Sequence, residues 1–248
     1  MQMQIQMQTK LVIIDLSSFI YRAFYAIAPL TTPTGVQVNA VYGIFSMLQK
    51  LFSTYNPTHI LIAKDSYKDS FRKKIYPEYK INRQLIPESL IPQFALIESL
   101  LEKMNLTSIV IDGHEADDII GSAVTQWKND FDQIYIASSD KDLMQFVGDN
   151  ILLLDGKLEK VYGVEEVIEK MGVAPNMILD YLSIVGDDSD NIPGIKGIGA
   201  KGAQKLLNEF NSLENIFNNL DKIINKKMLS SLSEYKSDAL LSKQLATI

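Results

Sequence analysis

The chain has 248 residues, of which 46% are hydrophobic and 22% charged, which is enough for one large or two small globular domains. It has no cysteine and only two histidines, which excludes a disulfide framework and an ordinary zinc site. The formal net charge is −6, so a nucleic-acid partner requires a local concentration of basic residues.

The N-terminal residues 1–8 contain neither a basic region nor a long apolar run, and no stretch of the sequence approaches 18 apolar residues. We therefore expect no signal peptide, no transmembrane span and no membrane partner. A cytoplasmic protein is the default expectation.

Apolar runs that resemble strands alternate with amphipathic patterns that resemble helices. Strands are predicted at residues 10–15, 59–63, 107–111 and 133–137, with short ones at 151–154 and 160–162. Helices are predicted at residues 16–28, 38–55, 91–104, from about 115 to 127, 164–171 and 200–210. This alternation predicts an α/β fold with a mostly parallel central sheet covered by helices on both faces.

Acidic residues follow the strands at their carboxyl ends, where parallel sheets bind ligands. Asp15 ends the first run and Asp65 follows the second. The third is followed by Glu115, Asp117 and Asp118, and the fourth by Asp140 and Asp142. Glu115 to Asp118 can also be read as a charged helix start, because the helix dipole favours acids there.

Residues 66–84 differ in composition from the acidic whole. Six basic residues oppose two acidic ones, and four aromatic residues lie among them: Lys68, Arg72, Lys73, Lys74, Lys80 and Arg83; Asp69 and Glu78; Tyr67, Phe71, Tyr76 and Tyr79. A solvated, salt-bridged helix is the alternative interpretation. Because cations neutralise phosphates and tyrosines stack on unpaired bases, we interpret the segment as a nucleic-acid contact.

Residues 186–199 add two acids, Asp187 and Asp190, and a glycine-rich turn, Gly197 to Gly199, before a helix. The turn alone is a weak signal, and a tight connection between two helices is the alternative. The nearby Lys196, Lys201 and Lys205 favour contact with backbone phosphate, without base preference.

Nine acids from five separated segments would repel one another if they converged. Two bare carboxylates ~4 Å apart cost about 4 kcal/mol at an effective dielectric near 20, and divalent cations would offset this cost. Oxygen donors favour Mg²⁺ or Mn²⁺, and two such ions support phosphodiester hydrolysis.

The segments 11–18, 21–23, 113–121, 139–143 and 186–199 together resemble the 5′ nucleases of the flap endonuclease superfamily. The strongest likeness is to the 5′-3′ exonuclease domain of bacterial DNA polymerase I. The resemblance implies a PIN-like nuclease core at residues 1–172, with a helical arch at about 66–90. It also implies a helical DNA-binding region at 173–248, with a helix-hairpin-helix of the helix-three-turn-helix type at about 181–210.

The resemblance implies a divalent-metal-dependent, structure-specific 5′-3′ exonuclease and 5′-flap endonuclease of replication and repair. Its expected substrate is DNA with a 5′ flap, nick or branch, including RNA-primed strands in Okazaki fragment processing. A polymerase in the same or another chain is an expected partner.

Motif matches assign roles to particular residues. The nine acids fall on metal-ligand positions for two ions: Asp15, Asp65, Glu115, Asp117, Asp118, Asp140, Asp142, Asp187 and Asp190. The expected phosphate-steering catalytic residues are Arg22, Arg72, Lys80 and Arg83, and the expected DNA contacts are Tyr76, Tyr79, Lys196, Gly197, Gly199, Lys201 and Lys205. The family often holds K⁺ at the Gly197 to Gly199 turn.

Two features depart from the family pattern. Lys64 replaces a hydrophobic residue beside Asp65, where its cation could compete with a metal or extend away. The chain also stops before the last strand region of the family, so we expect either a fragment of a polymerase or a standalone nuclease. A non-cleaving paralogue that binds flapped or branched DNA and a PIN-like ribonuclease are the alternative functions.

Overall fold

The computed structural model describes residues 8–248, which divide into two compact units. The first unit comprises residues 8–69, 85–143 and 147–163, and the second comprises 70–84, 144–146 and 164–248. Most of the expectation about a leader sequence concerns residues 1–7, which lie outside the described residues.

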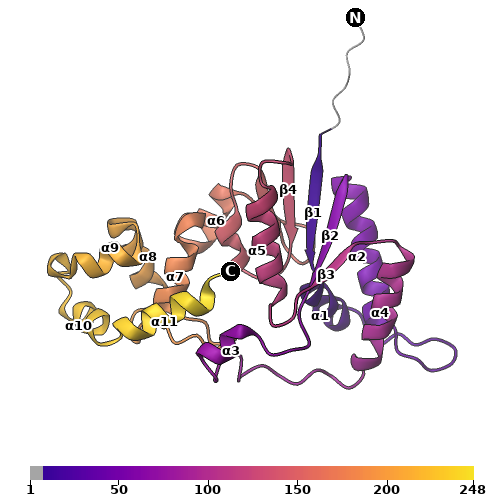
Figure 1. The fold of residues 1–248 in the computed structure, drawn as a ribbon, viewed down its shortest axis with the longest axis horizontal. Coiled ribbons are helices and arrows are strands. Elements are labelled where there is room, and N and C mark those ends of the chain that lie inside the picture. Colours follow the sequence, from indigo (N-terminus) through magenta and orange to yellow (C-terminus); the bar gives the residue numbers. More distant parts are fainter. Residues whose placement is uncertain (1–7) are drawn as a thin grey trace, which may run out of the picture. The chain divides into compact units, whose positions relative to one another are not determined.

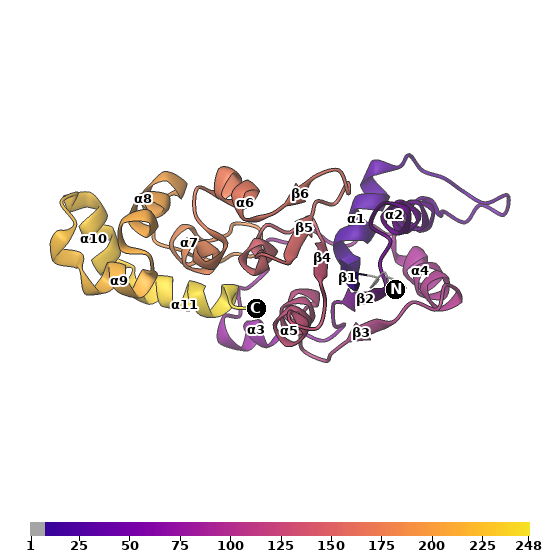
Figure 2. The same ribbon diagram turned by 90° about the horizontal axis from the view of Figure 1, so that it is seen from above.

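The first unit is built on a six-stranded sheet of order β3-β2-β1-β4-β5-β6, of which β1 to β4 can be found in Figure 1 and β5 and β6 in Figure 2. Its strands are β1 (Lys10–Asp15), β2 (His59–Lys64), β3 (Ser108–Val110), β4 (Gln133–Ala137), β5 (Ile151–Leu154) and β6 (Val161–Tyr162). Only β6 runs antiparallel to its neighbour, and Ile13 of β1 pairs in register with Leu61 of β2 and Ile136 of β4. The predicted mostly parallel α/β sheet is therefore confirmed.

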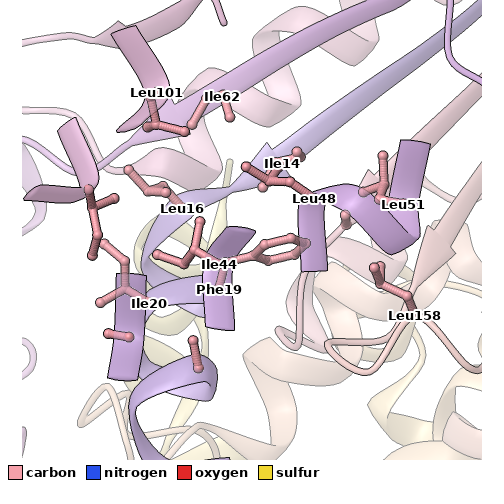
Figure 3. Packing of buried hydrophobic residues seen from close by; sticks show 14 of the residues in the cluster. Ile14, Leu16, Phe19, Ile20, Ile44, Leu48, Leu51, Ile62, Leu101 and Leu158 are labelled. Atoms are coloured by element: carbon pink, nitrogen blue, oxygen red, sulfur yellow. The ribbon is translucent and has the colours of Figure 1, made fainter. Parts of the chain in front are cut away.

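The central strand β1 is buried on both faces, as its uninterrupted run of β-branched residues predicts. Helices α1 (Leu16–Ala26), α2 (Asn39–Tyr55) and α4 (Ile91–Lys103) cover one face, and α5 (Ala116–Trp127) covers the other (Figure 2). On the first face Phe19 of α1 meets Leu48 of α2, and Ile62 of β2 lies beside Leu101 of α4 (Figure 3). This core holds the sheet rigid beneath its carboxyl edge.

The second unit is almost entirely helical. It contains α3 (Phe71–Ile75), α6 (Val164–Met171), α7 (Ile178–Val185), α8 (Ala200–Phe210), α9 (Leu213–Asn218), α10 (Lys226–Glu234), α11 (Lys236–Ala246) and the 3₁₀ turns Pro175–Met177 and Leu220–Lys222. A further 3₁₀ turn, Asp142–Phe146, has residues in both units. The Lys243 ammonium on α11 joins Asp180 of α7, at 2.8 Å, to Glu214 of α9, at 2.6 Å. Helices α7 and α8, with the turn between them, form the expected helix-hairpin-helix.

The predicted helical arch is mostly not helical. Between residues 66 and 90 the only helix is α3, at 71–75, and turns follow it. Pro77 explains the early end, because a residue that precedes proline is disfavoured in the helical region, and Tyr76 has an extended φ of −138°. Residues 70–84 also group with the C-terminal helices, whereas the sequence placed them in the nuclease core.

Among the helices of residues 8–248, none is long and apolar enough to cross a membrane.

Candidate functional site

The acids of the first unit follow four adjacent parallel strands. Asp15 is the last residue of β1, Asp65 follows β2, Glu115 lies between β3 and α5, and Asp140 follows β4. Because β3, β2, β1 and β4 are neighbours, their carboxyl ends form one continuous edge. Strand β1 has β2 as its neighbour on one side and β4 on the other, so the strand order reverses between β1 and β4. Asp15 and Asp140, which lie at the carboxyl ends of these two strands, flank that point.

Asp15 is the buried member of this group, with only 6% of its surface exposed. Ser138 Oγ donates to its Oδ2 at 2.7 Å, and the Ser18 amide donates to its Oδ1 at 3.1 Å. Burial raises the pKa of Asp15 to about 6, and repulsion from Asp65 and Asp140 adds to the shift. Its carboxylate therefore stands close to two others in a place where a cation would relieve the cost of its charge.

Asp65 connects the end of β2 to the start of α5. Its Oδ1 accepts from the Ala116 amide at 2.9 Å, and its Oδ2 accepts from the Ser17 hydroxyl. Ser66 adds a second connection, because its Oγ accepts from the Gly113 amide at 3.2 Å. The two acidic loops are thus held together without using all the lone pairs of Asp65.

Glu115 and Asp118 form a reciprocal capping box at the start of α5. The Glu115 amide donates to Asp118 Oδ2 at 2.9 Å, and the Glu115 side chain accepts from the Asp118 amide. The charged helix start that the sequence also permitted is therefore present. Asp117 lies between them and is partly exposed.

The loop after β4 is organised by Ser138, which is 1% exposed. Its hydroxyl accepts from the Asp140 amide at 3.0 Å while it donates to Asp15. Asp140 Oδ1 in turn accepts from the Asp142 amide at 2.8 Å. Ser138 and Ser17 were missed by sequence reasoning, and their only signal is their position next to the acidic motifs.

The donor set of the first unit fits a hard divalent cation that keeps part of its water. Within residues 8–248, no group of three or more acidic or histidine side chains is arranged to coordinate an ion with protein atoms alone. The available donors are carboxylate oxygens, and Mg²⁺ characteristically binds through one or two carboxylates, waters and substrate phosphate. The residues present are compatible with that mode of binding.

Two basic residues lie near this edge. The Lys64 ammonium is 2.9 Å from Glu98 Oε2 on α4, so the structure selects the alternative in which Lys64 extends away from the acids. A Cβ on Gly156 would collide with Ser139 Oγ and come within 3.0 Å of Arg22 Cδ. Gly156 therefore leaves space for Arg22 beside the loop that follows β4.

The other two predicted ligands, Asp187 and Asp190, belong to the second unit, in the turn between α7 and α8. Asp187 Oδ1 accepts from the Ser189 amide at 2.8 Å and from Ser189 Oγ at 2.6 Å. Asp190 Oδ1 accepts from Arg83 Nη2 at 2.8 Å, while its Oδ2 lies 3.6 Å from Lys80 Nζ and 3.2 Å from the Tyr79 hydroxyl. Two expected phosphate-steering residues and one expected DNA contact therefore converge on one expected metal ligand.

One expected phosphate-steering residue, Arg72, and one expected DNA contact, Tyr79, are buried. Arg72 is 1% exposed, and its guanidinium donates from Nε to Leu245 O at 2.8 Å and from Nη2 to Thr247 O at 2.6 Å. It therefore holds the end of α11 and is not available to a phosphate in this conformation. Tyr79 is 3% exposed, so its ring cannot stack on a base here, whereas Tyr76 is partly exposed.

The glycine-rich turn presents an exposed surface. Gly197 has a φ of +88°, which favours glycine, and Ile195 and Ile198 anchor the turn in the core at 2% and 4% exposure. Gly199 is the N-cap of α8, and no side chain of the protein caps the first amides of this helix. The side chains of Lys196, Lys201 and Lys205 are exposed around it.

A parallel α/β sheet with acids along its carboxyl edge, in a chain that also carries a helical hairpin with an exposed glycine turn, defines the class of carboxylate-cluster nucleases. Family models support this class along almost the whole chain. A 5′-3′ exonuclease N-terminal resolvase-like domain matches residues 10–172, and a 5′-3′ exonuclease C-terminal SAM fold matches residues 173–248. The chain belongs to the 5′-3′ exonuclease family.

Individual relatives agree. A 5′-3′ exonuclease of Buchnera aphidicola is 38% identical over 244 residues, which cover 96% of this chain and 85% of the relative. DNA polymerase I of Caldicellulosiruptor bescii is 43% identical over 245 residues, but the chain spans only 29% of its length. The solved structure of T5 D15 protein shares the fold, with a TM-score of 0.82 and 23% identity over 96% of this chain and 89% of that one.

Proposed function

We propose that the chain is a divalent-metal-dependent, structure-specific 5′ nuclease that hydrolyses phosphodiester bonds in DNA. The observation that carries this proposal is the carboxyl edge of the sheet. Buried Asp15 stands there beside Asp65 and Asp140, and hydroxyl and amide donors fix their orientation. A cluster of this kind is costly as a purely structural feature but suits the binding of cations.

The cofactor is proposed to be two Mg²⁺ or Mn²⁺ ions. When bound, such ions lower the pKa of a water and stabilise the attacking and leaving oxygens of an in-line displacement. We assign Asp15, Asp65, Glu115, Asp117 and Asp140 as the main donors of the first unit, with Asp118, Asp142, Asp187 and Asp190 as further candidates. The T5 D15 protein was co-crystallised with metal ions, which supports this choice of cofactor.

The basic residues are proposed to hold the substrate. Arg22, Lys80 and Arg83 would contact the phosphate that is cleaved, and Tyr76 would stack on an unpaired base. The Gly197 to Gly199 turn, with Lys196, Lys201 and Lys205, would hold the backbone of a duplex. A K⁺ ion at this turn would need carbonyls other than that of Gly199, which already accepts from the Gly202 amide at 2.9 Å and the Ala203 amide at 3.0 Å.

The proposed substrate is DNA with a 5′ flap, nick or branch, including RNA-primed strands. A solved structure of T5 D15 flap endonuclease is a pseudo-enzyme-product complex with DNA and metal ions, and the DNA polymerase I relatives support a polymerase as the companion activity.

A panel of labelled substrates tests the function. The parent chain with Mg²⁺ should cleave a 5′-flap duplex and a nicked duplex, and it should leave a matched 3′-flap duplex largely intact. Tight binding to the flap without cleavage at any metal concentration would favour the non-cleaving paralogue. Preferential cleavage of single-stranded RNA would favour the PIN-like ribonuclease.

A further inference from the structure

The Asp190 carboxylate is the centre of a polar network inside the second unit. Its side chain is only 15% exposed, and that of Lys80 only 13%. Arg83 donates to Oδ1 from both Nη2, at 2.8 Å, and Nε, at 3.2 Å. Lys80 and the Tyr79 hydroxyl occupy the side of Oδ2. Both oxygens are therefore engaged by the segment that carries the expected phosphate contacts.

The backbone reinforces this contact. The Lys80 amide donates to Asp190 O at 2.9 Å, and the Asn191 side chain donates to Glu78 O at 2.9 Å. Lys80 adopts a left-handed φ of +59°, which is unfavourable for a residue with a side chain. This conformation lets both the amide and the ammonium of Lys80 address Asp190, and the surrounding hydrogen bonds maintain it.

We propose that Asp190 is a positioning residue for Lys80 and Arg83. In the substrate-free protein its carboxylate holds both side chains in place, and it releases them when it binds a divalent cation. The inference rests on the proposed function, which assigns Lys80 and Arg83 to the phosphate. One carboxylate cannot keep two cationic partners and also serve as a close ligand of a divalent ion, because like charges would then meet around it. Metal loading and the availability of these cations are thereby coupled.

Trypsin offers a direct readout, because it cleaves after lysine and arginine only when the side chain can leave its partners. Cleavage after Lys80 and Arg83 is followed by mass spectrometry in the full chain with EDTA. Asp190→Asn should raise the cleavage rate at these two bonds roughly tenfold. The reason is that the rate is set by the fraction of molecules in which this segment has opened and left its partners. Asp188→Asn, in the same turn and with the same change of charge, should leave the rate unchanged.

Mg²⁺ supplies the second arm. Added to the parent chain, it should raise cleavage after Lys80 and Arg83 towards the rate of Asp190→Asn, and that variant should no longer respond. Cleavage after the exposed Lys226 and Lys227 serves as the internal control for effects of the metal on trypsin. Tyr79→Phe removes one hydrogen bond to Asp190 and keeps the buried ring, so it should give an intermediate rate even if Asp190→Asn folds poorly.

Equal rates for Asp190→Asn and Asp188→Asn, with no effect of Tyr79→Phe, would overturn the positioning role. A parent chain whose protection is unchanged by saturating Mg²⁺ would overturn the exchange. Neither readout uses DNA, so failure here leaves the proposed nuclease activity standing, and absence of nuclease activity leaves the protection result interpretable.

Discussion

Among the predicted ligands of the first unit, Asp15 is buried, Asp65 is exposed and the others are partly exposed. The sequence was sufficient to place Asp15 and Asp65 at strand ends, because apolar β-branched runs are easy to recognise. It could not show that Arg72 and Tyr79 are covered. Their partners, Leu245, Thr247 and Asp190, are distant in the sequence, and burial by such residues leaves no local signal.

The raised pKa of Asp15 predicts how metal-free stability depends on pH. Because this pKa rises from 3.8 to about 6 in the folded chain, the folded state favours the protonated carboxyl. The contribution of Asp15 therefore becomes less favourable as the pH rises from about 4 through 6, by about 3 kcal/mol in total. Asp15→Asn cannot titrate, so its stability relative to the parent should increase by up to about that amount between pH 4 and pH 8.

Urea unfolding of both proteins in EDTA measures this difference. A stability difference between Asp15→Asn and the parent that is equal at pH 4 and pH 8 would show that burial of the Asp15 charge is not costly.

At the scale of elements, the sequence predicted most helices and strands to within two residues, since their apolar periodicity is regular. The arch was the main failure. The arch was expected to be helical from the family resemblance, but Pro77 ends its helix early. The packing of residues 70–84 with the C-terminal helices depends on tertiary contacts, which leave no local signal in the sequence.

The contact between Arg72 and α11 predicts a structural role. Arg72→Ala should lower the free energy of unfolding by about 2–4 kcal/mol, because it leaves a cavity and removes the donors to two carbonyls. The neighbouring exposed Lys73→Ala should change it by less than about 0.5 kcal/mol. Chemical denaturation compares the two, and an Arg72→Ala variant as stable as Lys73→Ala would contradict the role.

The hairpin turn predicts a phosphate contact at the start of α8. Lys201→Ala should weaken binding to duplex DNA and reduce the slope of log K against log salt by about 0.9, the value for one phosphate contact. Lys128→Ala, at the opposite end of α5 from the acids, is the control. Binding titrations at several salt concentrations test this, and identical slopes for the two variants would remove Lys201 from the interface.

At the scale of the whole molecule, both the α/β sheet and the helical C-terminal region were predictable, because strand and helix patterns separate along the chain. The grouping into units was not. The segment 70–84 is inserted between two parts of the first unit, yet it packs with helices that begin near residue 164. A division drawn along the sequence cannot represent a chain that crosses between units and returns.

In the proposed function, the carboxylates at the edge of the sheet are the cation-dependent site of cleavage. Single-turnover cleavage of a 5′-flap DNA in saturating Mg²⁺ tests this most directly, with Asp15→Asn and Asp117→Asn compared with Asp112→Asn, an exposed acid paired with Lys68. We predict that the first two variants lose at least roughly 100-fold in rate, that Asp112→Asn stays close to the parent, and that EDTA stops cleavage. Undiminished cleavage by Asp15→Asn and Asp117→Asn, or cleavage that persists in EDTA, would contradict the account.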